Sequence, residues 1–293
     1  KPLMLMAVVS FFYTFLTNWM LNHFGGAVQL GYYQIAYRFS AIALLATTSI
    51  LRIFWKEMAV LDEENDSKRS QELFYRVLKI VFFFGSTIAG FILPWSKEII
   101  LILLGKSYLG GSLVFSIMLL YPIHQTMGQV LGATYQSKSM IKSYAMVSIA
   151  PTLLAIVTTY FLLAPSTNEI PGLSLGGFGM SLNMVVIQFF SVSLSLYVIC
   201  KMNSWKLKWG FQFMVLGVIL LLGYLAKSLV EDLIFRGANL ITTQAMIMHI
   251  ALAFFVYISL VLCFMLSKTE LILGIERKLL LAMIPFVKPM RRV

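Results

Sequence analysis

Charged side chains are scarce in this sequence. Lys, Arg, Asp and Glu together make up only 12% of its 293 residues, whereas an ordinary globular domain has about 25%. Hydrophobic residues account for 59% of the chain, and its mean hydropathy is +0.86. So little polar surface excludes soluble enzymes, disulfide-stapled secreted domains and disordered chains. The composition predicts an all-α polytopic membrane protein.

Residues that build catalytic or metal centres are also few. Cys200 and Cys263 lie in apolar runs without metal-ligand spacing, so we expect both to be small core residues. His23, His124 and His249 have no Cys, His or acid at ligand spacing, and we expect them to be packed or interfacial. No phosphate-binding loop and no zinc, haem or hydrolase motif occurs. We therefore expect neither enzymatic activity nor a cofactor.

Acidic residues are missing from the centres of the apolar runs. Proton- or sodium-driven carriers usually keep a carboxylate inside the membrane, where its energetic cost marks a functional site. We expect no such site here. The twelve acids fall in loops, in the tail or at span edges: Glu57, Asp62, Glu63, Glu64, Asp66, Glu72, Glu98, Glu169, Glu231, Asp232, Glu270 and Glu276.

Eight long apolar runs are present, each near the roughly 20 residues that a helix needs to cross a bilayer. The runs are continuous and not alternating, which excludes a membrane β-barrel. Residues 96–104 are too few to cross and predict a half-helix or an interfacial segment ending at Gly105, and residues 269–293 predict an interfacial basic tail. The eight runs cover residues 3–21, 32–55, 77–95, 112–134, 143–164, 178–200, 209–230 and 244–267.

Positive charge is distributed unevenly among the loops. If the N-terminus is cytoplasmic, Arg38 and Arg52 lie inside a span, only Lys97, Lys106, Lys227 and Arg236 lie outside, and the other 17 of the 23 basic residues face the cytoplasm. This asymmetry predicts a multi-pass protein of the cell inner membrane with both chain ends cytoplasmic. It also assigns the net charge of +11 to the bilayer surface and not to a nucleic-acid partner.

Polar residues within the runs form stripes at helical spacing. Small and polar residues often serve only to pack membrane helices, so a structural role stays open for most of them. We expect the chemistry to lie in the longest stripe, in run 32–55, which only Leu45 interrupts. The stripes are Gln34, Arg38, Ala41, Thr48, Ser49 and Arg52; Ser10, Thr14, Thr17 and Asn18; Tyr121, Gln125, Gly128, Gln129 and Gly132, beside a kink expected at Pro122; and Gln188, Ser191 and Ser195.

Arg38 is the most informative of these residues. An arginine near the bilayer midplane costs about 3 kcal/mol on insertion scales. Two interpretations stay open, namely a side chain that reaches back to the membrane surface, or a water-filled cavity that receives an anionic group. Arg52 lies closer to the cytoplasmic end, where we expect a membrane-surface anchor.

Three segments resemble the polysaccharide or oligosaccharide flippases of the O-antigen type, within the multidrug/oligosaccharidyl-lipid/polysaccharide exporter superfamily. The first is residues 15–43, with Asn18, the Gly26–Gly31–Tyr32 spacing and the Ala36-Tyr37-Arg38 triplet. The others are ILPWSKEIILILLGKSYLGG at 92–111 and GQVLGATYQSKS at 128–139. The chain departs from the pattern at Trp19, where many members carry an acid, and this leaves the energy source open.

The resemblance implies a C-terminal portion equivalent to helices seven to fourteen of a two-lobed fold. Residues 1–200 would form a six-helix transport lobe, 201–267 two additional helices, and 268–293 the basic tail. The chain begins with Lys, and its first run starts at residue 3 without a signal-peptide pattern, so we expect it to start partway through a larger protein.

The implied substrate is a polyprenyl-diphosphate-linked oligosaccharide, moved by alternating access for lipopolysaccharide or other cell-surface polysaccharide synthesis. A polysaccharide polymerase and glycosyltransferases are the implied protein partners. Arg38 would bind the diphosphate, and the other expected substrate-binding residues are Gln34, Asn18, Thr14 and Gln125. Two alternatives remain open: a cation-coupled drug or metabolite exporter of the same fold, and a non-transporting membrane scaffold or membrane-embedded enzyme.

Overall fold

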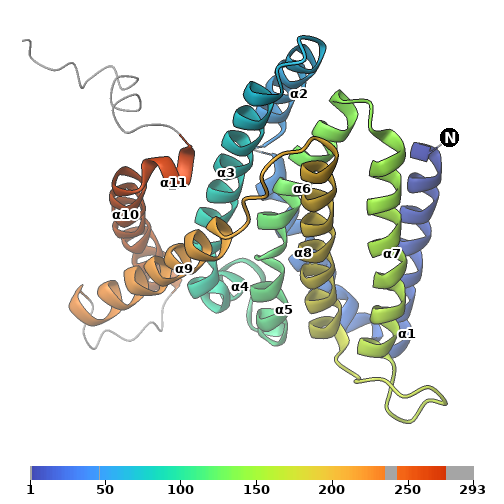
Figure 1. Ribbon diagram of the computed structural model, residues 1–293. Coiled ribbons are helices and arrows are strands. Elements are labelled where there is room, and N and C mark those ends of the chain that lie inside the picture. The colour runs from blue at the N-terminus through green and yellow to red at the C-terminus, as the bar shows by residue number, and fades with distance from the viewer. Residues whose placement is uncertain (1, 46, 235–242, 275–293) are drawn as a thin grey trace, which may run out of the picture.

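The computed structural model describes residues 2–45, 47–234 and 243–274, and every regular element in these ranges is a helix (Figure 1). The expected all-α class is confirmed. The elements are α1 Pro2–Leu45, α2 Thr48–Glu63, α3 Ser67–Ile92, η1 Leu93–Trp95, α4 Ser96–Leu104, η2 Lys106–Gly111, α5 Ser112–Met118, α6 Tyr121–Ser137, α7 Ile141–Leu163, α8 Gly176–Met202, α9 Phe211–Leu229, η3 Val230–Ile234, α10 Thr243–Ser267 and α11 Thr269–Leu273.

Seven helical segments of the described chain are long and apolar enough to cross a membrane. Eight runs were expected, and the difference lies at the N-terminus, where the first run and most of the second are joined in one segment. The protein is thus a multi-pass membrane protein. The seven segments are Pro2–Ile42, Ser67–Leu104, Lys106–Ser137, Ile141–Leu163, Gly176–Met202, Phe211–Asp232 and Thr243–Ser267.

Helix α1 is bent at Gly26, whose φ of 79° and ψ of 170° are not helical. Residues 2–25 (the first limb) and 27–45 (the second limb) fold back on each other. This is shown by a 2.7 Å hydrogen bond that Gln34 Nε2 donates to Asn18 Oδ1. Sixteen residues of straight helix would hold these side chains about 24 Å apart. A single glycine therefore replaces the connecting loop that the sequence indicated at residues 22–31.

Two of the expected continuous runs are interrupted. Run 32–55 ends as a helix at Leu45 and resumes at Thr48 as α2, so Arg38 and Arg52 do not lie on one straight helix as the stripe required. Run 112–134 is divided into α5 and α6 at residues 119–120. A kink was expected at Pro122, and the second break fits it, because Pro122 has no N–H to donate to the carbonyl of Met118 at the end of α5.

The predicted half-helix is confirmed as α4, which ends at Gly105 with a φ of 84°. A side chain rarely adopts this backbone conformation, which explains why a glycine stops the helix there.

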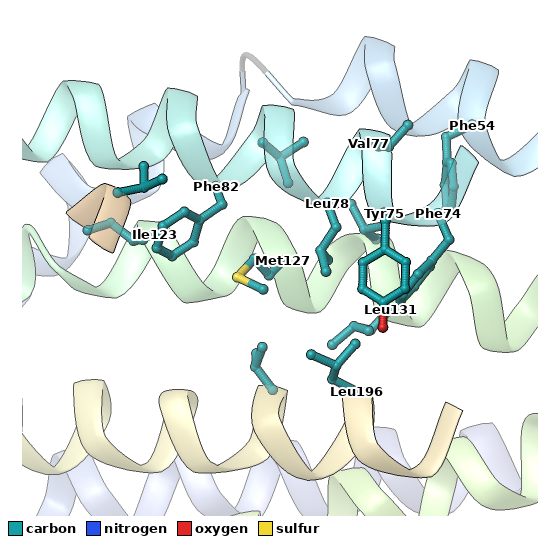
Figure 2. Packing of buried hydrophobic residues seen from close by; sticks show 14 of the residues in the cluster. Phe54, Phe74, Tyr75, Val77, Leu78, Phe82, Ile123, Met127, Leu131 and Leu196 are labelled. Carbon is teal, nitrogen blue, oxygen red and sulfur yellow. The ribbon is translucent and has the colours of Figure 1, made fainter. Parts of the chain in front are cut away.

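Helix α3 carries the main core on one face. Phe74, Leu78 and Phe82 point toward α6, and Leu196 of α8 closes the cluster from the other side (Figure 2). A second cluster joins both limbs of α1 to α4, α5 and α8 through residues such as Met20, Ala36 and Phe115. Helix α6 contributes to both clusters and therefore connects the two halves of the bundle.

Helices α9 and α10 pack on the far side of α3. A Cβ added at Gly223 of α9 would overlap the carbonyl oxygen of Gly90 in α3, and Tyr257 of α10 donates a 2.8 Å hydrogen bond to the carbonyl of Thr87. Their buried residues belong to the same cluster as those of α3. The assignment of residues 1–200 and 201–267 to separate units stays a prediction, and most of the expected tail, from 275 onward, lies outside the described residues.

The loops gather at two ends of the bundle. The α2–α3, α6–α7 and α8–α9 connections lie at one end, and the bend of α1, Gly105 and the α7–α8 loop lie at the other (Figure 1). The same two groups of loops were separated in the count of basic residues from the sequence. Lys1, Arg236 and the basic residues of 275–293 lie outside the described residues. We call the first the basic end; its cytoplasmic location stays a prediction.

Candidate functional site

The polar residues of α1 form one seam across its two limbs. Asn18 donates to the carbonyl of Thr14 at 2.8 Å and accepts from Gln34, and Arg38 follows Gln34 by one helical turn on the second limb. Thr14 and Arg38 are equally far along the chain from the bend, twelve residues on either side of Gly26. Four of the five expected site residues are thereby brought into one continuous strip.

The seam is open where it reaches Arg38. Thr14 and Arg38 are exposed, whereas Asn18 and Gln34 are half-buried. Within the described part of the chain, Arg38 forms no ion pair and no hydrogen bond. Its guanidinium group is therefore free to bind a ligand through two parallel hydrogen bonds, the arrangement that suits a phosphate.

Tyrosines border the seam, a feature that the sequence analysis missed. The Tyr37 ring is stacked 6.1 Å from that of Tyr33 and lies 6.1 Å from that of Tyr121 on α6. Tyr33 and Tyr13 both direct their hydroxyl groups at Met184 of α8, at 3.6 and 3.5 Å, so α8 holds the two limbs together. The four-residue spacing of Tyr33 and Tyr37 was the available sequence signal, because it places both rings on one helix face.

Gln125, the fifth expected residue, is on α6 and not on α1. It is one turn beyond Tyr121, whose ring contacts that of Tyr37. A Cβ added at Gly128 would lie 3.9 Å from Gln125 Oε1 and 3.1 Å from Gln188 Nε2. The small residue thus lets amides from α6 and α8 share one region, as the two stripes indicated.

Arg52 is exposed, and its role as a membrane-surface anchor stays a prediction. It lines a cavity of about 410 Å³ between α2, α6 and α7, together with Gln129, Gln136 and Tyr144. Thr47 donates a 2.8 Å hydrogen bond to Gln129 Oε1 and so ties the break after α1 to the rim of this cavity. Arg52 thus borders polar side chains of α6 and α7.

The cysteines and histidines were expected to be packed or interfacial. Cys200 is buried in the core, but Cys263 is exposed, since α10 is an outer helix with little of its surface covered. His124 and His249 are buried, as expected, and His23 is exposed and stacked on Trp19 at 5.0 Å. The described residues include no cluster of three His, Cys, Asp or Glu that could hold a metal ion.

Glu98 is more buried than its position at a span edge indicated. Its side chain is 19% exposed and pairs at 2.7 Å with Lys227 of α9, which also donates to the carbonyl of Pro94 at 2.9 Å. The Lys227 ammonium lies 4.5 Å from the centre of the Trp95 ring. A carboxylate thus does lie within the bundle, but a lysine compensates its charge.

Residues 1–113 match the model of a family described as polysaccharide biosynthesis proteins. The matched segment spans α1 to α4 and contains Thr14, Asn18, Gln34 and Arg38, but not Gln125. No curated protein and no solved structure matches the chain. The matched segment and the bundle of membrane-crossing helices fit a transporter role in polysaccharide synthesis.

Proposed function

We propose that this chain is part of a flippase that moves a polyprenyl-diphosphate-linked oligosaccharide across the cytoplasmic membrane by alternating access. The observation that carries the proposal is the unpaired Arg38 guanidinium at the open end of the Thr14–Asn18–Gln34 seam. A diphosphate is the part of such a lipid that an arginine binds best, through charge-assisted hydrogen bonds.

The groups around Arg38 suit the rest of that ligand. Side-chain amides such as those of Asn18 and Gln34 donate and accept hydrogen bonds, as sugar hydroxyls require. Tyr37, the neighbour of Arg38 in the chain, is 37% exposed and offers a partly open aromatic ring. The family match supports the polysaccharide context, since it covers the whole of the seam.

In this proposal the protein binds and releases its substrate without covalent chemistry. Movement of the limbs of α1 relative to α8 would expose the seam to one side of the membrane and then to the other. The protein would lie in the inner membrane with the basic end cytoplasmic, where polymerases and glycosyltransferases that act on the same lipid could reach it.

The test is glycolipid translocation by the full-length protein in proteoliposomes. We expect Arg38→Ala to lower the initial translocation rate about tenfold or more, since a charge-assisted contact contributes roughly 1.5–3 kcal/mol. Arg69→Ala is the matched control, because Arg69 is an exposed arginine in the first turn of α3, away from α1. Wild-type translocation by Arg38→Ala would contradict the proposal.

A further inference from the structure

A second group of unpaired cations lies far from the α1 seam. A cavity of about 660 Å³ opens at the basic end between α3, the α8–α9 connection and α11. Two carboxylates, Glu72 and Glu270, are also at its rim. We call it the basic cavity, and its basic side chains are Lys68, Arg76, Lys79, Lys206 and Lys208.

Among the described residues, basic side chains outnumber acidic ones in the lining of the basic cavity. None of its five basic groups forms an ion pair with a described acid. Elsewhere at the same end, Lys138 and Arg69 do pair with Asp62 and Asp66. A cluster of basic side chains without paired carboxylates attracts anions.

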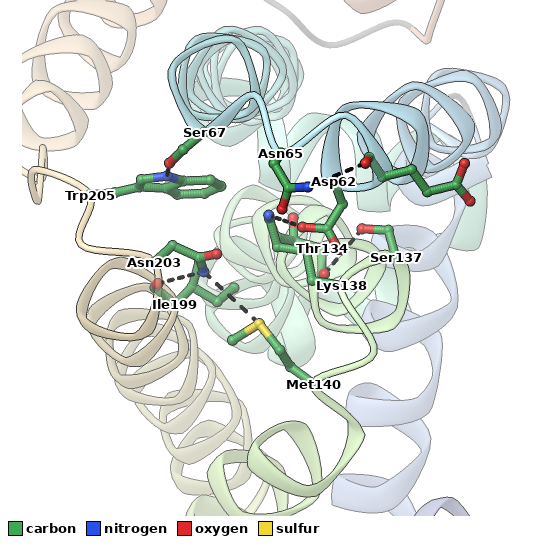
Figure 3. Close-up of polar contacts among 11 residues, drawn as sticks. Asp62, Asn65, Ser67, Thr134, Ser137, Lys138, Met140, Ile199, Asn203 and Trp205 are labelled. Atoms are coloured by element: carbon green, nitrogen blue, oxygen red, sulfur yellow. Dashed lines mark hydrogen bonds and ion pairs between the residues drawn. The ribbon is translucent and has the colours of Figure 1, made fainter.

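The walls of the basic cavity are held in place by specific contacts. Tyr75 Oη donates a 2.6 Å hydrogen bond to the carbonyl of Lys206 and accepts one of 3.1 Å from the backbone N–H of Lys208. Just before this segment, the buried Trp205 donates from Nε1 to Ser67 Oγ at 3.1 Å (Figure 3). Both lysines are therefore positioned by α3 and not by a free loop.

The opposite wall is fixed in the same way. Lys79 Nζ donates a 3.1 Å hydrogen bond to the carbonyl of Glu270 in α11. A Cβ added at Gly274 would lie 3.8 Å from the Cα of Arg76. The end of α11 thus packs directly on α3, and the space between the two walls is preformed.

The level of the cavity along α3 identifies the kind of anion. The cavity flanks residues 68–79, and the apolar run of α3 begins at residue 77. The cavity therefore lies where the apolar span of α3 gives way to charged sequence, which is the level of the lipid headgroups. Basic pockets between helices at this level bind the headgroups of anionic lipids.

We propose that the basic cavity is a binding site for a phosphate group at the membrane surface, distinct from the α1 seam and independent of the proposed flippase activity. Phosphate oxygens would accept hydrogen bonds from Arg76 and Lys208, which both line the cavity. The phosphate can belong to an anionic phospholipid or to a soluble ion, and the two sources share this chemistry.

The experiment measures the thermal unfolding midpoint of the full-length protein in a neutral detergent. The protein is titrated separately with short-chain phosphatidylglycerol, short-chain phosphatidylcholine and inorganic phosphate at constant ionic strength. A ligand that binds only the folded protein raises the midpoint. A response to phosphatidylglycerol alone assigns the site to a lipid headgroup. A response to phosphatidylglycerol and phosphate shows that the phosphate group suffices. A response to neither, or an equal response to phosphatidylcholine, overturns the proposal.

The double variant Arg76→Ala/Lys208→Ala should weaken the response about tenfold or more in ligand concentration. Lys56→Ala/Lys142→Ala is the matched control, because it removes the same charge from exposed positions outside the cavity. If the double variant does not fold, Lys206→Ala replaces it, since Tyr75 binds only the backbone carbonyl of Lys206. Equal losses in the cavity variant and the control would show a nonspecific charge effect and contradict a site. Arg38→Ala should leave the response unchanged, which separates this test from that of the flippase proposal.

Discussion

Gln34 donates a 2.7 Å hydrogen bond to Asn18 across the bend of α1. This bond joins residues that are sixteen positions apart in the chain and lie on different limbs. It connects the two parts of the polar seam, Thr14–Asn18 and Gln34–Arg38. The bond thus couples the shape of α1 to the placement of the candidate ligand-binding group.

A double-mutant cycle on this pair should show coupling. Asn18→Ala and Gln34→Ala remove the same bond, so the double variant should lose less free energy of unfolding than the two single losses added together. We expect a coupling energy of about 0.6–1.7 kcal/mol, the range for hydrogen bonds between membrane helices. Unfolding of the full-length protein in mixed micelles measures it, and strictly additive losses would show that the contact does not form.

The bend itself depends on Gly26. Gly26→Ala should destabilise the protein by about 1–3 kcal/mol, because a φ of 79° with a ψ of 170° is a conformation that essentially only glycine adopts. No heavy atom lies within 4 Å of the added Cβ, so the effect should come from the backbone alone.

Gly31→Ala is the control for this substitution. Its added Cβ also meets nothing within 4 Å, but Gly31 has no positive φ. Alanine is preferred over glycine in a helix by up to about 1 kcal/mol, so this variant should be neutral or stabilising. Equal unfolding midpoints for the two variants would mean that α1 is not bent at Gly26.

The contact between α3 and α9 predicts a third effect. Gly223→Ala should destabilise the fold by about 1–3 kcal/mol, because its Cβ would overlap the carbonyl oxygen of Gly90 and force the two helices apart. Gly217→Ala in the same helix meets nothing within 4 Å and should leave stability unchanged or raise it. Chemical unfolding of both variants compares them, and a tolerated Gly223→Ala would argue against this close approach.

The Glu98–Lys227 pair predicts a non-additive result. Lys227→Met should cost about 3 kcal/mol of stability, because it leaves a mostly buried carboxylate without a compensating charge. Glu98→Gln/Lys227→Met should recover part of that loss, since the uncompensated charge is then gone.

Lys97→Met provides the comparison for that pair. Lys97 is an exposed lysine beside Glu98 without an ion pair among the described residues, so its loss should change the unfolding midpoint little. If the double variant is as unstable as Lys227→Met, uncompensated charge is not the cause.

Arg38→Lys separates the geometry of the guanidinium from its charge. A lysine retains the positive charge but cannot form two parallel hydrogen bonds to one phosphate. We expect glycolipid translocation between that of wild type and that of Arg38→Ala. Full activity of Arg38→Lys would indicate that charge alone suffices at this position.

Hydropathy determined the helical class and nearly all of the membrane-crossing segments, because a bilayer requires long apolar helices whatever their packing. Local residue chemistry determined the stop at Gly105 and the break before Pro122. Sequence spacing also placed Gln34 and Arg38 on one helix face, since that relation is set by helical geometry alone.

The tertiary structure decided the relations that depend on residues distant in the chain. The sequence indicated a loop between the first two runs, whereas the fold reverses α1 at Gly26 and so joins Asn18 to Gln34. It also interrupts the stripe between Arg38 and Arg52, places Cys263 on the outside of α10 and brings Lys227 to Glu98. Only packing brings Lys208 of the α8–α9 connection and Arg76 of α3 to one cavity, because no local periodicity records which helices become neighbours.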